Sequence, residues 1–86
     1  MDPYDILSYP LMGEKATIMR ETENVITFIV AKKSTKKSIR AAVEELFKAK
    51  VVNVRVMHTT DGTKKAHVRL DKKFSADEIA SHMGVN

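Results

Sequence analysis

The residues that could carry out acid–base, nucleophilic or metal chemistry are few and widely spaced in this chain of 86 residues. It has no cysteine, which excludes a thiolate nucleophile, a cysteine-ligated zinc and a disulfide. The histidines His58, His67 and His82 show no metal-ligand spacing, and the nearby acidic residues are better explained as strand-end and helix-cap residues. His67 is most simply a surface side chain. We therefore expect no catalytic residue, no bound metal and no cofactor.

Basic residues form the pattern with the clearest chemical use. Five occur without an intervening acidic residue between positions 31 and 43, and a pair follows later in the chain: Lys32, Lys33, Lys36, Lys37 and Arg40, then Lys64 and Lys65. Long cationic side chains neutralise phosphates, and each neutralised phosphate adds salt-dependent affinity. For a lysine cluster taken alone, a solvated charged surface is the simpler interpretation, and nucleic-acid binding is the alternative.

The charge is unevenly divided along the chain. Residues 1–24 carry five acidic and two basic groups, residues 25–73 carry thirteen basic and four acidic groups, and residues 74–86 carry two acidic groups. The net charge of +4 therefore combines a body of +9 with ends of −3 and −2. We expect the middle of the chain to meet an anionic partner and the acidic ends to face solvent or protein.

Three helices are predicted to position these residues. The clearest begins after Thr35 as N-cap and repeats apolar residues at helical spacing, at Ile39, Ala42, Val43, Leu46 and Phe47. A helix of about two turns is expected over Glu14–Glu21, after Gly13. A short C-terminal helix is expected to begin with a capping box at Ser75 and to stop at Gly84.

Three strands, and a possible fourth, complete the predicted elements. Val25–Ala31 is β-branched and aromatic and is apolar at both alternating positions, so both of its faces should be covered. Residues 51–58 and 64–70 alternate at period two and flank Thr60-Asp61-Gly62-Thr63, which indicates a hairpin. Asp2-Pro3 is a possible helix start, and a short strand near residues 6–12 is the possible fourth.

The hairpin register can be predicted from which residues must share a face. Pairing Val54 with Leu70 and Val56 with Val68 keeps the apolar residues together, whereas a slip of one residue would turn every side chain over. Gly62 or Thr63 is then expected in a left-handed or bulge position. The same register places Arg55 opposite Arg69, which is destabilising unless an anion lies near both. This expected pairing favours nucleic-acid binding over a solvated charged surface.

These elements predict a single α+β domain over residues 1–86. We expect a small antiparallel sheet of three or four strands with helices on both faces, in α/β/α layers, and a right-handed strand–helix–strand crossover. No apolar stretch is long enough to insert into a membrane, the first residues are unlike a signal peptide, and the lack of cysteine fits a reducing cytosol. We therefore expect a soluble intracellular protein.

Several segments together resemble the large-ribosomal-subunit protein family numbered twenty-three, in its short archaeal and eukaryotic form. The resemblance runs the whole length and rests on Tyr9-Pro-Leu-Met-Gly-Glu-Lys-Ala-Thr17, on Asn24 with Phe28 and Val30, on 36–47 with 51–56, on 62–70, and on 77–80 with Gly84. An RNA-recognition-motif domain has a similar element order. It would stack bases on aromatic residues that 64–70 lacks, and it needs a last strand that this chain does not have.

The resemblance implies a structural protein that binds folded large-subunit ribosomal RNA beside the exit of the nascent-chain tunnel, in cytoplasmic ribosomes. The basic residues that match the family's expected RNA contacts are Lys15, Lys32, Lys33, Lys36, Lys37, Arg40, Arg55, Lys64, Lys65 and Arg69. It also implies neighbouring ribosomal proteins as partners and a docking surface, with Glu14 as a candidate, for signal recognition particle or other exit-site factors. Outside the ribosome we expect a monomer.

The sequence departs from the family's usual pattern at two places. Gly13 stands where the family usually has Thr or Ser, so the helix that follows lacks its capping hydroxyl. The hairpin loop is short compared with bacterial relatives.

Two other functions are possible for this chain. The first rival is a small protein-interaction module that holds an acidic partner on a basic helix face. The second is a small enzyme or ligand-binding domain, which would need a pocket with a perturbed titratable group.

Overall fold

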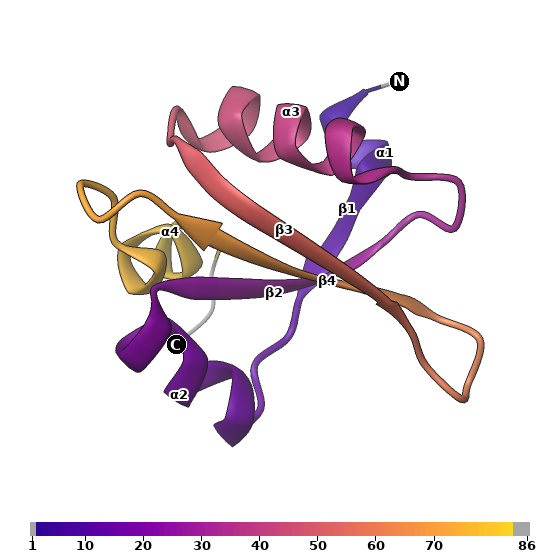
Figure 1. The fold of residues 1–86 in the computed structure, drawn as a ribbon, viewed down its shortest axis with the longest axis horizontal. Coiled ribbons are helices and arrows are strands. Elements are labelled where there is room, and N and C mark those ends of the chain that lie inside the picture. Colours follow the sequence, from indigo (N-terminus) through magenta and orange to yellow (C-terminus); the bar gives the residue numbers. More distant parts are fainter. Residues whose placement is uncertain (1, 84–86) are drawn as a thin grey trace.

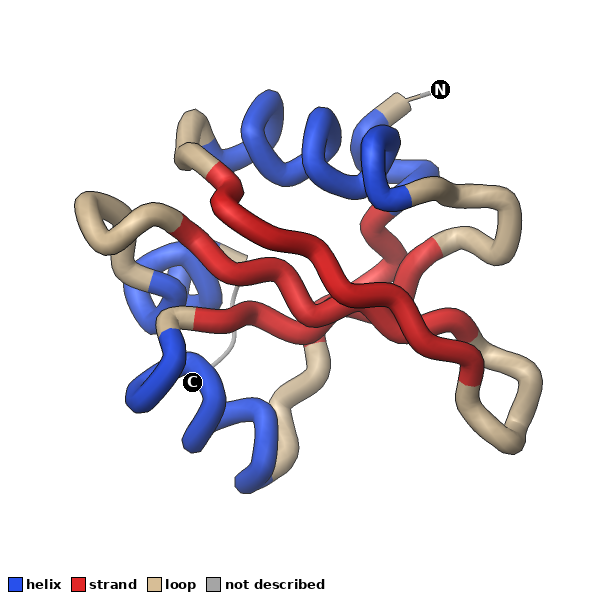
Figure 2. Tube along the Cα trace, viewed as in Figure 1, coloured by secondary structure: helices blue, strands red, loops and turns tan. Residues whose placement is uncertain are grey.

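The computed structural model describes residues 2–83, which fold into four helices and four strands (Figures 1 and 2). The order along the chain is α1 (Pro3–Ile6), β1 (Leu7–Pro10), α2 (Glu14–Glu23), β2 (Val25–Val30), α3 (Lys36–Phe47), β3 (Val51–His58), β4 (Lys64–Leu70) and α4 (Ala76–His82). Every predicted element is present, including the short strand β1. The predicted stop at Gly84 lies outside the described residues.

Local sequence accounts for where the helices begin. The Asp2 side chain accepts a hydrogen bond from the Tyr4 N–H, with Pro3 in the first turn of α1. Thr35 and Ser38 form a reciprocal capping box at the start of α3, with hydrogen bonds of 3.1 and 2.8 Å. Gly13 offers α2 no side-chain cap, as the sequence predicted.

The four strands form one antiparallel sheet in the order β1-β2-β4-β3. Strands β2 and β3 both pair with β4 and therefore run parallel to each other, and the chain passes from one to the other through α3. Strand β3 forms a free edge of the sheet, and β1 forms the other edge. This arrangement confirms the predicted α+β fold.

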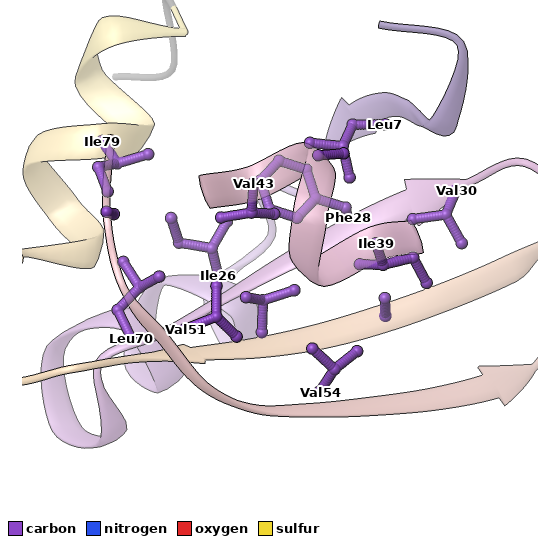
Figure 3. Close-up of a cluster of buried hydrophobic side chains, with 14 of the residues drawn as sticks. Leu7, Ile26, Phe28, Val30, Ile39, Val43, Val51, Val54, Leu70 and Ile79 are labelled. Carbon is purple, nitrogen blue, oxygen red and sulfur yellow. The ribbon is translucent and has the colours of Figure 1, made fainter. Parts of the chain in front are cut away.

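The main core lies on the face of the sheet that α1, α3 and α4 cover (Figure 3). Phe28 is fully buried there and stacks on Phe47 of α3, with ring centroids 6.3 Å apart. On the other face, α2 packs on β2, and Ala16 of α2 and Thr27 of β2 are buried. Figure 1 shows α3 and α2 on opposite sides of the strands. Strand β2 is therefore covered on both faces, as predicted.

The predicted hairpin register is wrong by two residues. Val54 lies opposite Val68, and Arg55 lies opposite His67 rather than Arg69. Both registers put the same side chains on the same face, so the apolar pattern could not distinguish them. Arg69 instead pairs with Glu23, with 3.4 Å between Nη2 and Oε1. The expected cost of two facing arginines therefore does not arise, and this pairing gives no support for an anionic partner.

The turn chemistry explains the observed register. Thr59 and Thr63 close the loop with a hydrogen bond from the Thr59 N–H to the Thr63 carbonyl at 2.9 Å, leaving three residues between them. Gly62 takes the last of these positions with φ of +88°, which is the left-handed residue that such a loop requires. The prediction of a left-handed Gly62 is confirmed. The loop is centred one residue earlier than predicted.

Within residues 2–83, no helix is long and apolar enough to cross a membrane.

Candidate nucleic-acid interface

Three predicted RNA contacts meet in a groove between α2 and the sheet. This α2 groove has a volume of about 510 Å³ and is lined by Leu11, Gly13, Lys15, Ala16, Met19, Glu23, Thr27, Arg55, Met57, Lys65 and His67. Lys15 comes from α2, Arg55 from β3 and Lys65 from β4. The alternation of strand side chains places Arg55, Lys65 and His67 on the face opposite the main core. Three cations therefore converge on one concave surface.

His67 lies in the same groove, half-buried rather than freely exposed as the sequence suggested. Its Nδ1 is 2.8 Å from the Thr27 hydroxyl oxygen on the neighbouring strand. Burial lowers the pKa of His67 below its ordinary value, and the charges of Lys65, Arg55 and Lys15 lower it further, while Glu23 acts in the opposite direction. The groove therefore favours neutral histidine and is electropositive where an anion could enter.

A second basic groove lies between α3 and the free edge of the sheet. This α3 groove has a volume of about 320 Å³ and is lined by Lys36, Lys37, Arg40, Val52, Asn53 and Val54. Arg40 makes an ion pair with Glu44, at 3.7 Å between Nε and Oε2. Both side chains are well exposed, so this pair leaves the Arg40 guanidinium open to a partner.

The remaining predicted contacts have different surroundings. Lys32 and Lys33 are exposed in the connection between β2 and α3. The Lys64 ammonium group donates hydrogen bonds to the carbonyls of Lys32, at 3.3 Å, and of Ser34. Lys64 therefore holds this connection against β4, which is a structural role that its sequence did not reveal.

The two grooves lie on opposite faces of the sheet and share strand β3. Arg55 and Met57 line the α2 groove, whereas Val52, Asn53 and Val54 line the α3 groove. Because β3 is an edge strand, no other strand of the described chain separates the two grooves along that edge. The basic residues are therefore arranged on both sides of one exposed edge rather than on one flat face.

Of the acidic residues near the ends of the chain, Glu23 lines the α2 groove, whereas Asp77 and Glu14 line neither basic groove. Arg20 is buried and pairs with Asp77 of α4, at 3.2 Å between Nε and Oδ1, which ties α2 to α4. Glu14 is exposed at the start of α2. Met12 and Ile18, which are 52% and 50% exposed, lie close to Glu14 in sequence. Across residues 2–83, no three His, Asp or Glu side chains cluster closely enough to hold a metal ion.

Comparison with known proteins identifies the family. The model of the family described as ribosomal protein L23 matches residues 5–77. The large ribosomal subunit protein uL23 of Methanococcus maripaludis strain C7 is 39% identical over 85 residues, covering 99% of both chains. The proteins of the same name from strain C5 and from strain S2 are 39% and 38% identical over the same length.

These matches agree with the resemblance seen in the sequence. Ribosomal proteins of this family are structural and non-enzymatic, and archaeal ribosomes are cytoplasmic. The nearly complete coverage of both chains marks the short form. The chain therefore belongs to the ribosomal protein L23 family of the large ribosomal subunit, as a short, archaeal-type member.

Proposed function

We propose that this chain binds folded large-subunit ribosomal RNA through the two basic grooves that flank β3, near the polypeptide exit tunnel. The observation that carries the proposal is their placement: three cations line each groove, and the grooves share one edge strand. A sugar–phosphate backbone that follows this edge would meet basic side chains on both sides of β3. Charges arranged in this way bind phosphates and recognise RNA mainly by shape.

The side chains of the two grooves suit phosphate contacts better than base stacking. None of the residues that line either groove is Phe, Tyr or Trp. Single-stranded RNA proteins rely on such aromatic platforms, whereas proteins that recognise folded RNA rely on phosphate and 2′-hydroxyl contacts. The proposed partner is therefore folded RNA.

We further propose that the outer side of α2 forms part of a docking site for exit-site factors such as signal recognition particle. Glu14 supplies an exposed charge at the start of α2, and the exposed Met12 and Ile18 supply apolar surface near it in sequence. Exposed apolar side chains rimmed by charge are typical of protein-binding surfaces. Glu14→Lys and Ile18→Ser should each weaken factor binding to ribosomes that contain this protein, with no loss of RNA binding.

Salt-dependent binding tests the RNA contacts. Affinity for a large-subunit ribosomal RNA fragment would be measured between about 50 and 200 mM salt, where phosphate contacts give a steep linear dependence on a logarithmic scale. The double variants Arg55→Gln with Lys65→Gln, and Lys37→Gln with Arg40→Gln, should each reduce the slope by about 2, or about 1 per lost phosphate contact.

A matched control carries the same loss of charge away from both grooves. Lys72→Gln with Lys73→Gln removes two exposed cations from the connection between β4 and α4 and should leave the slope unchanged. Equal slopes for all three double variants would contradict the proposed contacts. Tight binding to an acidic protein, together with salt-independent binding to RNA, would instead support the rival interaction module.

A further inference from the structure

The α2 groove combines two kinds of surface that phosphate binding alone does not require. Lys15, Arg55 and Lys65 stand at the groove on three different elements. The groove also has apolar surface, to which the half-buried Met19 of α2 and Met57 of β3 contribute. A purely electrostatic contact would be served by a flat surface of exposed lysines.

Polar atoms also meet inside the groove. Thr27 is buried on β2, and its hydroxyl oxygen is 2.8 Å from Nδ1 of His67 on β4. This bond engages one ring nitrogen of His67, which lines the groove. A few placed polar groups within apolar walls are the usual composition of a small-molecule site, and the volume of about 510 Å³ falls within the usual range.

We infer that the α2 groove receives one unpaired nucleotide of the bound RNA, with its phosphate against Lys15, Arg55 and Lys65 and its base between Met19 and Met57. The inference rests on the proposed RNA-binding function and adds a defined subsite to it. Thioether side chains make favourable contacts with aromatic rings, so the two methionines can hold a base where the groove has no aromatic residue. His67 and Thr27 would hydrogen-bond the edge of that base.

The charge around the groove favours a nucleotide over an acidic peptide helix. The three cations come from α2, β3 and β4 and line the same groove as the two methionines, which matches one phosphate and one planar base. The acidic residue that lines the groove, Glu23, is engaged by Arg69 at 3.4 Å. An anion in the groove therefore meets three positive charges and one acid that is already paired.

Nucleotide binding to the full chain tests the inference. Uridine and adenosine 5′-monophosphates would be titrated into isotope-labelled protein and followed by amide and imidazole NMR signals, with inorganic phosphate and the free nucleosides as separate probes. The monophosphates should shift Thr27, Met57 and His67 in a saturable way and bind at least about tenfold more tightly than phosphate or nucleoside, which corresponds to about 1.4 kcal/mol.

Bound phosphate should also raise the pKa of His67 because it offsets the charges of Lys65, Arg55 and Lys15, while Glu23 already acts in that direction. Met57→Ala should weaken monophosphate binding several-fold and leave phosphate binding unchanged. Thr27→Val, which keeps a similar side-chain shape, should weaken it as well. Lys72→Gln lies outside the groove and should change neither.

Several results would overturn the inference. Equal affinities for phosphate and monophosphate would show a charged surface only, and shifts confined to the α3 groove would place the site elsewhere. An acidic amphipathic peptide that shifts the same signals at lower concentration than the nucleotides would assign the groove to protein. If the unaltered protein binds large-subunit RNA while the nucleotides fail, this inference is wrong and the proposed function stands. If RNA itself does not bind, both are wrong.

Discussion

Asn24 joins three elements, and its replacement should cost more stability than its partial exposure suggests. It ends α2 in the left-handed conformation, with φ of 57° and ψ of 40°. Its side-chain NH₂ group lies 3.2, 3.3 and 2.8 Å from the carbonyl oxygens of Leu70, Asp71 and Phe74, and its Oδ1 accepts from the Ala76 N–H at 2.8 Å. These bonds hold the end of β4 and the start of α4 against α2, which forms one wall of the α2 groove.

The expected cost follows from these contacts. An amide NH₂ group has two hydrogens, so it satisfies two of the three carbonyls fully, and Oδ1 adds a third hydrogen bond. At about 0.5–1.5 kcal/mol each, the three bonds are worth about 2–4 kcal/mol, and a left-handed alanine adds about 1 kcal/mol. Asn24→Ala should therefore lower the free energy of unfolding by about 3–5 kcal/mol, a large share of the total for a domain of this size.

Asn24→Gly separates the two contributions. Glycine adopts the left-handed conformation without the steric cost but loses the same hydrogen bonds, so this variant should be about 1 kcal/mol more stable than Asn24→Ala. Urea denaturation followed by circular dichroism gives both values. A loss below about 1 kcal/mol in Asn24→Ala, or equal losses in the two variants, would refute the reasoning.

Three further changes have expected outcomes. Phe28→Ala empties a fully buried site against Phe47 and should lower the free energy of unfolding in urea by about 3–5 kcal/mol. A decrease below about 1 kcal/mol would mean that the site is poorly packed. Hydrogen bonds from the hydroxyls of Thr59 and Thr63, together with the Thr63 N–H, lower the pKa of Asp61 from 3.8 to about 2, so its stabilising effect is complete above pH 3.8 and is lost as the pH falls toward 2. Asp61→Asn should flatten acid unfolding in that window, and an unchanged curve would contradict this. His67 should titrate below its ordinary pKa of 6.5 in NMR. Its neutral form therefore stabilises the fold above pH 6.5, and this contribution is lost as the pH falls from 6.5 through the lowered pKa. Arg55→Gln should raise that pKa, whereas Lys72→Gln should not.

The elements could be predicted from the sequence because their signals are local. Helix α3 shows its apolar stripe at helical spacing and its capping residue Thr35, and the structure confirms both. The strands could be predicted from the alternation of apolar and polar residues in β3 and β4, and from the apolar residues at both alternating positions of β2. Helix α2 runs two residues beyond its predicted end at Glu21 because Asn24, rather than Glu21, supplies the left-handed stop.

The hairpin register shows what a face-sharing argument can and cannot decide. Alternation fixes only which residues share a face, and registers that differ by two residues satisfy it equally. The position of Gly62 in the loop carries the missing information, because a three-residue loop places its left-handed residue last. If Gly62 is taken as the last residue of a three-residue loop, the sequence predicts the observed pairing of Val54 with Val68.

The candidate site was predicted as a set of basic residues, but its shape was not. Lys15 is 40 residues before Arg55 in the chain, and only the packing of α2 on the sheet brings both into one groove. The sequence indicates a surface histidine at position 67, because nothing near it in the chain shows that Thr27 lies 2.8 Å from its ring. Long-range neighbours of this kind depend on tertiary packing, which leaves no periodic signal in the sequence.

Directed hydroxyl-radical cleavage tests most directly the proposal that the two basic grooves flanking β3 face RNA and that acidic α4 does not. Because the chain has no cysteine, a single introduced cysteine can carry a tethered iron reagent. Val52→Cys places it on the free edge of β3, where Val52 is 47% exposed, and Glu78→Cys places it on exposed α4. In assembled large subunits, strong cleavage of the ribosomal RNA from position 52 and weak cleavage from position 78 are predicted. Strong cleavage from position 78 with none from position 52 would contradict the account.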